Sequence, residues 1–325
     1  MTDQAAFEDR LRKQIDAYHE AALVYAAVKL GLPDRLAAGP ATGAQLAGTL
    51  ELSAPHFTRF LRGLCGIGIC EELEGGAFAL TSGGQSLRSG SASRLAEKVQ
   101  IVVGQYWWPW ANFASSLETG KPAFEQCFGM SVFDWRARHE QQGALFDSYL
   151  AKETGAQLGA IVEVLDFSGV GTVAILQTFS HFAGAPLDRS RLVELSLPFK
   201  PLLDVAKRLE FVPGNLLDGI PVKADLYLLQ GVLQQYDDAD ALTILRNCRA
   251  AMPDGARLAI IERLLPERAA DDPAAIMLDL HMMTITGGRA RSLAEFETLL
   301  AEAGLTLAKV TPTTSRLRII QAGTA

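Results

Sequence analysis

The sequence lacks the features of several protein classes. It has no run of about 18 apolar residues and no apolar segment near its start, MTDQAAFEDRLRKQ, so neither a membrane span nor an export signal is expected. Positive charge is also scarce. The 30 lysines and arginines are outnumbered by 37 acidic residues, which gives a net charge of -7, whereas general nucleic-acid binders carry a basic face. We therefore expect a cytoplasmic protein that binds neither nucleic acid nor membranes.

Cysteine is sparse as well. The chain has four cysteines in 325 residues, at positions 65, 70, 127 and 248, with no CxxC pair and no Cys/His group at metal-ligand spacing. Neither a disulfide framework nor a metal site is predicted. What the sequence does contain is 49% hydrophobic residues, enough to bury a large core across two domains.

The first hundred residues have the pattern of a winged helix. Apolar residues recur at steps of three and four from Phe7 to Leu30, which predicts a long amphipathic helix. Two shorter helices are expected in 41–50 and 55–68, and a hairpin around Gly75 and Gly76. A DNA reader would use the helix with Arg59 and Arg62, but two arginines on an acidic chain favour a structural or dimerising role.

The second half alternates strand and helix patterns. The stretch Ala160–Ala174, AIVEVLDFSGVGTVA, predicts a buried strand that ends in a glycine turn, where open α/β sheets hold ligands. Further strands are expected in 191–197, 208–212, 224–229, 257–262, 305–310 and 316–321, separated by helices such as 239–252 and 292–304. This alternation predicts a mostly parallel, doubly wound sheet.

Several segments together resemble the small-molecule O-methyltransferases of bacteria and plants. The segments are YAAVKLGLPDRL, FALTSGGQSLRS, YWWPW, LETGKPAFEQCFG, ADLYLLQGVLQQYDDAD and LDLHMMTITGGRARS. The resemblance covers nearly the whole chain. It implies a mainly helical winged-helix dimerisation domain (1–98), aromatic-rich connecting helices (99–155) and a Rossmann-like α/β class I methyltransferase domain (156–325).

The region 99–150 holds all four tryptophans, and such aromatic density fits either a core or a flat apolar ligand pocket. The resemblance favours a homodimer whose pocket takes a small aromatic or polyketide-like substrate. The expected pocket residues are Tyr106, Trp110, Phe113, Phe128, Met130, Phe133, Trp135, Tyr149 and Met282.

The match departs from the family at the positions that bind the cofactor, S-adenosylmethionine (SAM). The family has an acid at the end of its first strand, which Asp166 matches, followed by a glycine-rich loop. In this chain the loop is SGVGT, and a non-glycine residue at positive φ costs about 1–2 kcal/mol. Two further family acids, which hold the ribose and adenine, are matched by a serine and an asparagine. The resemblance places this altered site at Asp166, Ser168, Gly169, Gly171, Glu194, Ser196 and Asn215.

A further departure concerns the chemistry. Gln234 stands where the family has a histidine that acts as general base, and a positioned base supplies about 10²–10⁴ in rate. Of two glutamates that flank that histidine in plant members, one matches Glu262 and the other is Ala290 here. The candidate catalytic residues are Gln234, Glu262, His281 and Asp237.

These departures lead to the hypothesis of a natural-product enzyme that has lost SAM binding and methyl transfer. It would need no cofactor and would catalyse a cyclisation, isomerisation or pericyclic step, with Gln234 holding a carbonyl. Two alternatives stay open: a working SAM-dependent O-methyltransferase with a divergent loop, and a non-catalytic ligand-binding or partner protein. A weaker alternative is a nicotinamide cofactor, because Gly169–Ala174 fits GxGxxA with Glu194 further on.

Overall fold

The computed structural model describes residues 3–162, 164–165, 170, 173–176 and 215–324. The chain divides into two compact units, Met1–Trp107 and Trp108–Ala325. The expected segments 1–98, 99–155 and 156–325 concern the roles of the domains and stay a prediction.

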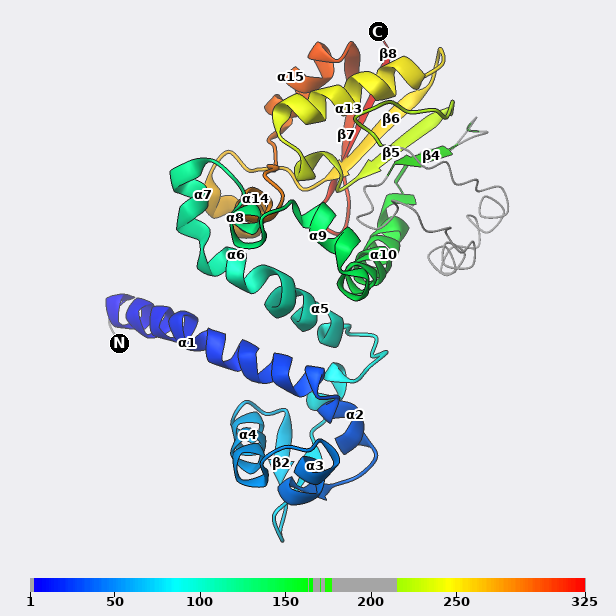
Figure 1. The fold of residues 1–325 in the computed structure, drawn as a ribbon. Coiled ribbons are helices and arrows are strands. Elements are labelled where there is room, and N and C mark those ends of the chain that lie inside the picture. Colours follow the sequence, from blue (N-terminus) through cyan, green and yellow to red (C-terminus); the bar gives the residue numbers. More distant parts are fainter. Residues whose placement is uncertain (1–2, 163, 166–169, 171–172, 177–214, 325) are drawn as a thin grey trace. The chain divides into compact units, whose positions relative to one another are not determined.

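The first unit combines helices with a small antiparallel sheet of order β1-β3-β2 (Figure 1). The long helix, the helix-turn-helix and the hairpin predicted for a winged helix are confirmed, and Cys70 pairs with Leu80 across the hairpin. The elements are α1 (Asp3–Lys29), α2 (Leu32–Ala37), β1 (Ala41–Thr42), α3 (Gly43–Thr49), α4 (Ala54–Gly66), β2 (Cys70–Glu72), β3 (Ala77–Leu80), η1 (Gly84–Leu87), α5 (Leu95–Ile101) and the π-helical η2 (Val102–Tyr106).

Local sequence explains these elements. Thr42 and Gln45 form a capping box, in which each side chain accepts a hydrogen bond from the other residue's backbone N–H, and this starts α3. On α4, Phe57, Leu61 and Leu64 recur at helical spacing and are buried in one core. The unit therefore has its own hydrophobic core.

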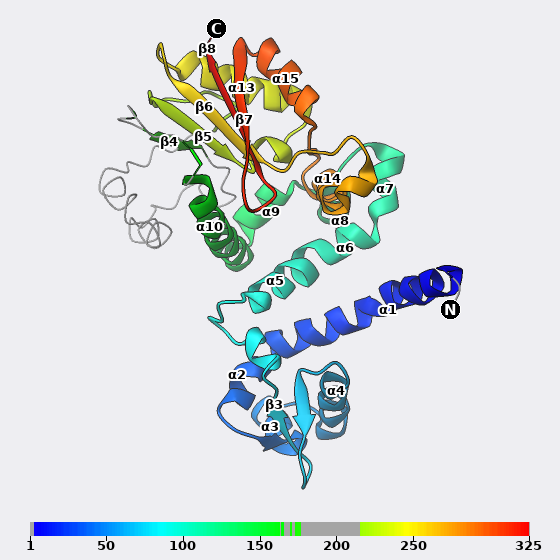
Figure 2. The same cartoon turned by 180° about the vertical axis from the view of Figure 1, so that it is seen from behind.

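Among its described residues, the second unit contains a five-stranded sheet of order β4-β5-β6-β8-β7. Strands β4, β5 and β6 are parallel, and β8 runs antiparallel between β6 and β7 (Figure 2). The elements are α6 (Trp107–Ala111), α7 (Phe113–Thr119), α8 (Ala123–Phe128), α9 (Val132–Arg138), α10 (Glu140–Val162), β4 (Val173–Leu176), β5 (Leu226–Gln230), η3 (Leu233–Gln235), α13 (Asp238–Ala251), β6 (Arg257–Glu262), η4 (Ala269–Asp271), α14 (Pro273–Ile285), α15 (Leu293–Glu302), β7 (Leu305–Pro312) and β8 (Arg318–Thr324).

Both faces of the central strands are buried. On β5, Tyr227 and Leu229 face the core shared with α13 and α15, while Leu226 and Leu228 belong to a second core on the other face. Because side chains alternate along a strand, a nearly continuous apolar run places one residue in each core in turn. The predicted α/β fold with a doubly wound sheet is confirmed.

The strand expected at the start of Ala160–Ala174 is wrong. Helix α10 continues to Val162, and the first sheet strand among the described residues of this unit is β4, which pairs with β5 from Val173 to Leu176. An apolar run without clear periodicity fits a helix end as well as a strand. The glycine-containing run from Ser168 to Thr172 thus precedes β4 in the chain, and the segment that leaves the carboxyl end of β4 begins at residue 177.

Candidate active site

The carboxyl ends of β5 and β6 carry two of the candidate residues. In open α/β sheets ligands bind outside this edge. After β5, Gly231 adopts a φ of 62°, which only glycine adopts readily, and the chain turns into η3 with Gln234 on it. A Cβ at Gly231 would lie 3.5 Å from Gln234 Nε2, so the amide folds back over the turn. Glu262 ends β6 directly beside it.

Glu262 lies beneath this loop and is 1% exposed. Its Oε1 accepts a hydrogen bond of 3.0 Å from the backbone N–H of Gln234, while its Oε2 has no partner among the described residues. Burial raises the pKa of the Glu262 carboxyl to about 7, although the backbone N–H of Gln234 and the charge of Arg291 act in the opposite direction. Glu262 can therefore exist in either protonation state near neutral pH.

Arg291 was missed by the sequence analysis. Its side chain is completely buried, and its guanidinium donates to the carbonyls of Leu233 and Tyr236 and to Asp238. The segment before it also approaches the loop closely. A Cβ on Gly288 would lie 2.3 Å from the carbonyl oxygen of Gln234. The run GGRAR contains this arginine, but its burial depends on tertiary packing that no local pattern reveals.

The remaining catalytic candidates have defined surroundings. Asp237 caps α13 by accepting a hydrogen bond from the backbone N–H of Asp240. His281, on α14, accepts a hydrogen bond of 3.1 Å at Nδ1 from the indole N–H of Trp110. Because an indole nitrogen only donates, Nδ1 carries no proton, and the neutral ring carries its proton on Nε2. Burial lowers the pKa of His281 to about 4, with a smaller effect of the Arg136 charge.

Aromatic rings stack around His281. Trp110 stacks on Phe113 at a centroid distance of 5.5 Å and on the His281 ring at 6.2 Å. Phe133 stacks on Tyr236, which follows η3, at 6.4 Å. These contacts bring part of the expected pocket to the loop after β5 and to α14, and we call the stack of Trp110, Phe113 and His281 the aromatic wall.

The other expected pocket residues are more dispersed. Phe128 and Trp135 pack around Phe124, with ring centroids 4.6 and 5.8 Å from it, and form part of a core. Met282 is 8% exposed, and Met130 and Tyr149 are partly buried. Tyr106 belongs to the first compact unit, whereas the other eight belong to the second.

The expected cofactor residues lie mostly outside the described residues. These are Asp166, Ser168, Gly169, Gly171, Glu194 and Ser196. Asn215 is described, and its Oδ1 accepts a hydrogen bond of 3.1 Å from the backbone N–H of Leu217, so this oxygen closes its own turn. Across the described ranges there is no cluster of three metal-ligating side chains and no helix long and apolar enough to cross a membrane.

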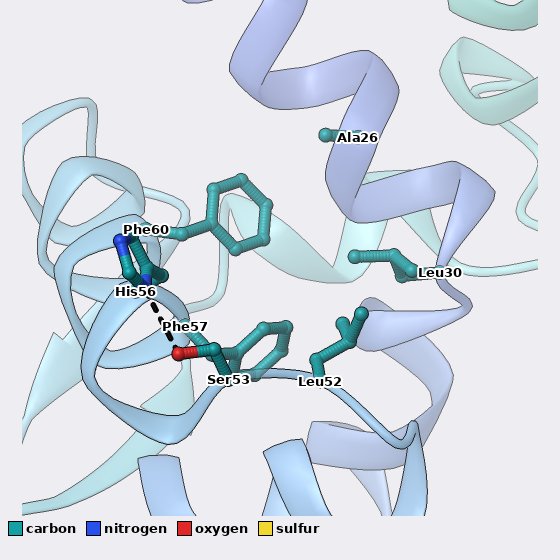
Figure 3. A pocket seen from close by; sticks show the side chains of 7 residues that line it. All are labelled: Ala26, Leu30, Leu52, Ser53, His56, Phe57 and Phe60. Atoms are coloured by element: carbon teal, nitrogen blue, oxygen red, sulfur yellow. Dashed lines mark hydrogen bonds between the residues drawn. The ribbon is translucent and has the colours of Figure 1, made fainter.

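A separate cavity lies within the first unit. Its volume is about 310 Å³, and Figure 3 shows its lining: Ala26 of α1 and Leu30 just after it, Leu52 and Ser53 just before α4, and His56, Phe57 and Phe60 of α4. The lining is apolar except for the side chains of Ser53 and His56, whose Oγ and Nδ1 are hydrogen bonded at 2.8 Å. It contains none of the candidate catalytic residues.

The fold and the edge at which the candidates gather define a class I methyltransferase. Solved structures agree: the mitomycin 7-O-methyltransferase MmcR has a TM-score of 0.83 at 28% identity, covering 99% of both chains. An O-methyltransferase from neocarzinostatin biosynthesis, in complex with SAM and 2-hydroxy-5-methyl naphthoic acid, has a TM-score of 0.77 at 27% identity, covering 94% of this chain and 96% of that one.

Sequence comparison gives the family. A model of the O-methyltransferase domain matches residues 110–306. The phenazine O-methyltransferase PhzM of Lysobacter antibioticus is 32% identical, covering 96% of this chain and 95% of its own length. The chain belongs to the O-methyltransferase family.

These relatives correct two expectations. The hypothesis of a cyclase or isomerase without a cofactor is wrong, because the relatives along the whole chain are named methyltransferases and one of them is seen with SAM. That hypothesis relied on the glycine run Ser168–Thr172 as the cofactor loop. Since this run precedes β4 instead of following it, its composition is no measure of what binds at the carboxyl edge.

Proposed function

We propose that this protein transfers the methyl group of SAM to an oxygen of a small, flat aromatic molecule in natural-product biosynthesis. The proposal is carried by the likeness to named O-methyltransferases along 96% of the chain. It is supported by the stacked rings beside the loop after β5, since flat apolar ligands bind against such rings.

The described residues fit a cofactor at the carboxyl edge. Strands β4 and β5 run parallel and end side by side, and Gly231 presents no side chain where the chain turns. Bound SAM would supply an activated methyl group on a sulfonium. Asn215 is the described candidate for a contact with it, through the Nδ2 donors of its amide. This chain's residues would then bind and orient the acceptor.

Gln234 limits how acidic the hydroxyl group of the methyl acceptor must be. A neutral amide can donate and accept hydrogen bonds but cannot take up a phenol proton at useful strength. The His281 nitrogen that points at Trp110 is already an acceptor, and its partner nitrogen carries the ring proton. We therefore propose an acceptor whose hydroxyl is acidic enough to ionise near neutral pH without a base, with Gln234 and His281 donating hydrogen bonds to it.

Methyl transfer from methyl-deuterated SAM, followed by mass spectrometry, tests this proposal. The acceptors are hydroxynaphthoic acids and hydroxynaphthalenes whose hydroxyl groups differ in acidity. The wild-type protein is expected to label the more acidic members. The variant Gln234→His restores a base and should increase transfer to the less acidic members by about 10²-fold. Equal rates across the acidity series, with no gain in the variant, would contradict this acceptor class.

A homodimer is proposed from α1. Four apolar side chains lie at helical spacing in its first part and are exposed: Phe7 (52%), Leu11 (43%), Ile15 (62%) and Tyr18 (52%). Such a stripe on a helix is typical of a contact with another chain. Light scattering should give a dimer for the wild type and for the control Gln14→Glu, and a monomer for Ile15→Glu. A monomeric wild type would contradict the proposal.

A further inference from the structure

One peptide group in the candidate site is held from both sides by buried ionisable side chains. The group joins Leu233 to Gln234, and so precedes the residue that stands at the centre of the loop after β5. Its carbonyl oxygen accepts a hydrogen bond of 2.8 Å from Arg291 Nη1. Its N–H donates to Glu262 Oε1 at 3.0 Å. The Arg291 guanidinium thus fixes one end of the peptide dipole and an oxygen of the Glu262 carboxyl group fixes the other.

Arg291 is suited to hold the loop because its planar guanidinium reaches several atoms at once. Besides the carbonyl of Leu233, it donates through Nη2 to the carbonyl of Tyr236 at 3.0 Å, and through Nε to Asp238 Oδ1 at 2.9 Å. These acceptors are spread over the chain from the first residue of η3 to the first residue of α13. A completely buried guanidinium is tolerated only when its donors are satisfied, and here the loop itself supplies the acceptors.

The loop also has little room to move where Gly288 approaches it. The backbone at Gly288 lies so close to Gln234, Gln235 and Tyr236 that a Cβ there would overlap their backbone atoms at 2.3 to 2.6 Å. Within the loop, Gln235 Nε2 donates to the carbonyl of Gly231 at 2.7 Å. The loop is therefore fixed by contacts from β6, from the segment after α14 and from its own first residue.

We propose that Arg291 is a positioning residue that, together with Glu262, fixes the peptide between Leu233 and Gln234 and thereby aims the Gln234 side chain at the ligand edge. Arg291 does this from behind the loop, where it is buried. Its effect on catalysis rests on the proposed methyl transfer, but its effect on the loop does not.

The chain offers a matched control for this arginine. Arg289, two residues earlier, pairs with the other oxygen of Asp238 at 2.9 Å and with Glu295, but its side chain is 41% exposed. The guanidinium hydrogen bonds of Arg289 go to these two carboxylates. Arg289→Gln therefore removes a positive charge beside Asp238, as Arg291→Gln does. It leaves in place the hydrogen bonds of Arg291 and Glu262 to the peptide between Leu233 and Gln234, which we call the clamp.

Steady-state kinetics test the catalytic part. Arg291→Gln should lower kcat about 10²-fold, the size of effect expected from misplacing a reacting group, while the dissociation constant for SAM stays within about twofold. Arg291→Lys should recover part of kcat, because an ammonium can reach one carbonyl but not the whole set. Arg289→Gln should change neither quantity by more than about twofold. An equal loss in Arg289→Gln, or no loss in Arg291→Gln, overturns the proposal.

Amide hydrogen exchange of residues 231–237 tests the structural part without turnover. Exchange at this segment should become faster in Arg291→Gln and stay unchanged in Arg289→Gln. If wild-type protein transfers no methyl group, the proposed function fails, and this measurement alone still decides whether the clamp exists. If Arg291→Gln does not fold, Arg291→Lys and Asp238→Asn replace it, and unchanged exchange in both contradicts the clamp.

Discussion

The loop after β5 and the aromatic wall use different forces to shape the same edge of the sheet. The loop is held by Arg291 and Glu262 through hydrogen bonds with defined directions. The wall of Trp110, Phe113 and His281 is held by stacked rings and a single indole hydrogen bond. Hydrogen bonds to charged groups are short and directional, whereas stacked rings define the plane of a contact. The loop is thus suited to align reacting atoms and the wall to accept a flat molecule.

Gly288→Ala should affect the loop most strongly. Its added methyl group would overlap the backbone of Gln234 and Gln235 at 2.3 Å, so the loop must shift. We expect kcat to fall by about 10²-fold, and overpacking to lower the free energy of unfolding by about 1–3 kcal/mol. Kinetics and chemical denaturation measure the two effects.

Gly48→Ala is the control for this change. Gly48 lies in α3 with open space around the position of a Cβ, so alanine should leave kcat unchanged and stabilise the helix slightly. If Gly288→Ala keeps wild-type kcat, catalysis does not depend on the position of the loop seen here. The proposal that the loop aligns reacting atoms, in contrast to the wall, would then be wrong.

Trp110→Phe should have a smaller effect, confined to the wall. It keeps a ring for stacking but removes the N–H that donates to His281 Nδ1. We expect a stability loss of about 1 kcal/mol, a KM for the acceptor raised a few-fold, and little change in kcat. The pKa of His281 should rise, because Nδ1 can then take a proton, and NMR titration of the ring measures this shift.

The control Trp108→Phe alters an indole that is 66% exposed and should leave stability, KM, kcat and the pKa of His281 unchanged. A fall in kcat with unchanged KM in Trp110→Phe would show that the wall aligns reacting atoms after all.

The last effects concern how the free energy of unfolding depends on pH. Burial raises the pKa of Glu262 from 4.5 to about 7, so its carboxyl binds a proton more tightly in the folded protein, and stability falls as pH rises between these values. Burial lowers the pKa of His281 from 6.5 to about 4, so stability rises with pH over that range. Between about pH 4.5 and 6.5 the two slopes oppose each other.

Single variants separate the contributions of Glu262 and His281 to the pH dependence of stability. Measured as differences from wild type by urea denaturation, Glu262→Gln should make stability rise more steeply with pH in this window, and His281→Asn should make it fall. Each difference is at most about 1.4 kcal/mol per pH unit. Two differences of the same sign would contradict the burial of one of the two groups.

The sequence predicted the regular parts of the fold better than the site. Helix α1, the hairpin of β2 and β3, and strands β5 to β8 have clear periodicity or turn residues, and they were located from these patterns. The strand predicted at the start of Ala160–Ala174 was wrong because a short apolar run fits the end of a helix as well as a strand. Arg291 escaped notice because arginines are mostly exposed, and no local pattern distinguishes Arg291 from Arg289, whose side chain is 41% exposed.

Gln234 and Glu262 were found through family resemblance, and the structure adds how they are connected. Their hydrogen bond runs from a backbone N–H to a carboxylate, a link that depends on two strands lying side by side. Such a link cannot be inferred from residues 28 positions apart in the chain.

Calorimetric titration of the purified protein with SAM tests cofactor binding without any knowledge of the acceptor. We expect one site per chain with a dissociation constant in the micromolar range, and competition by S-adenosylhomocysteine. Absence of heat with SAM and with S-adenosylhomocysteine, in protein shown to be folded, would contradict the claim that this chain is a SAM-dependent methyltransferase.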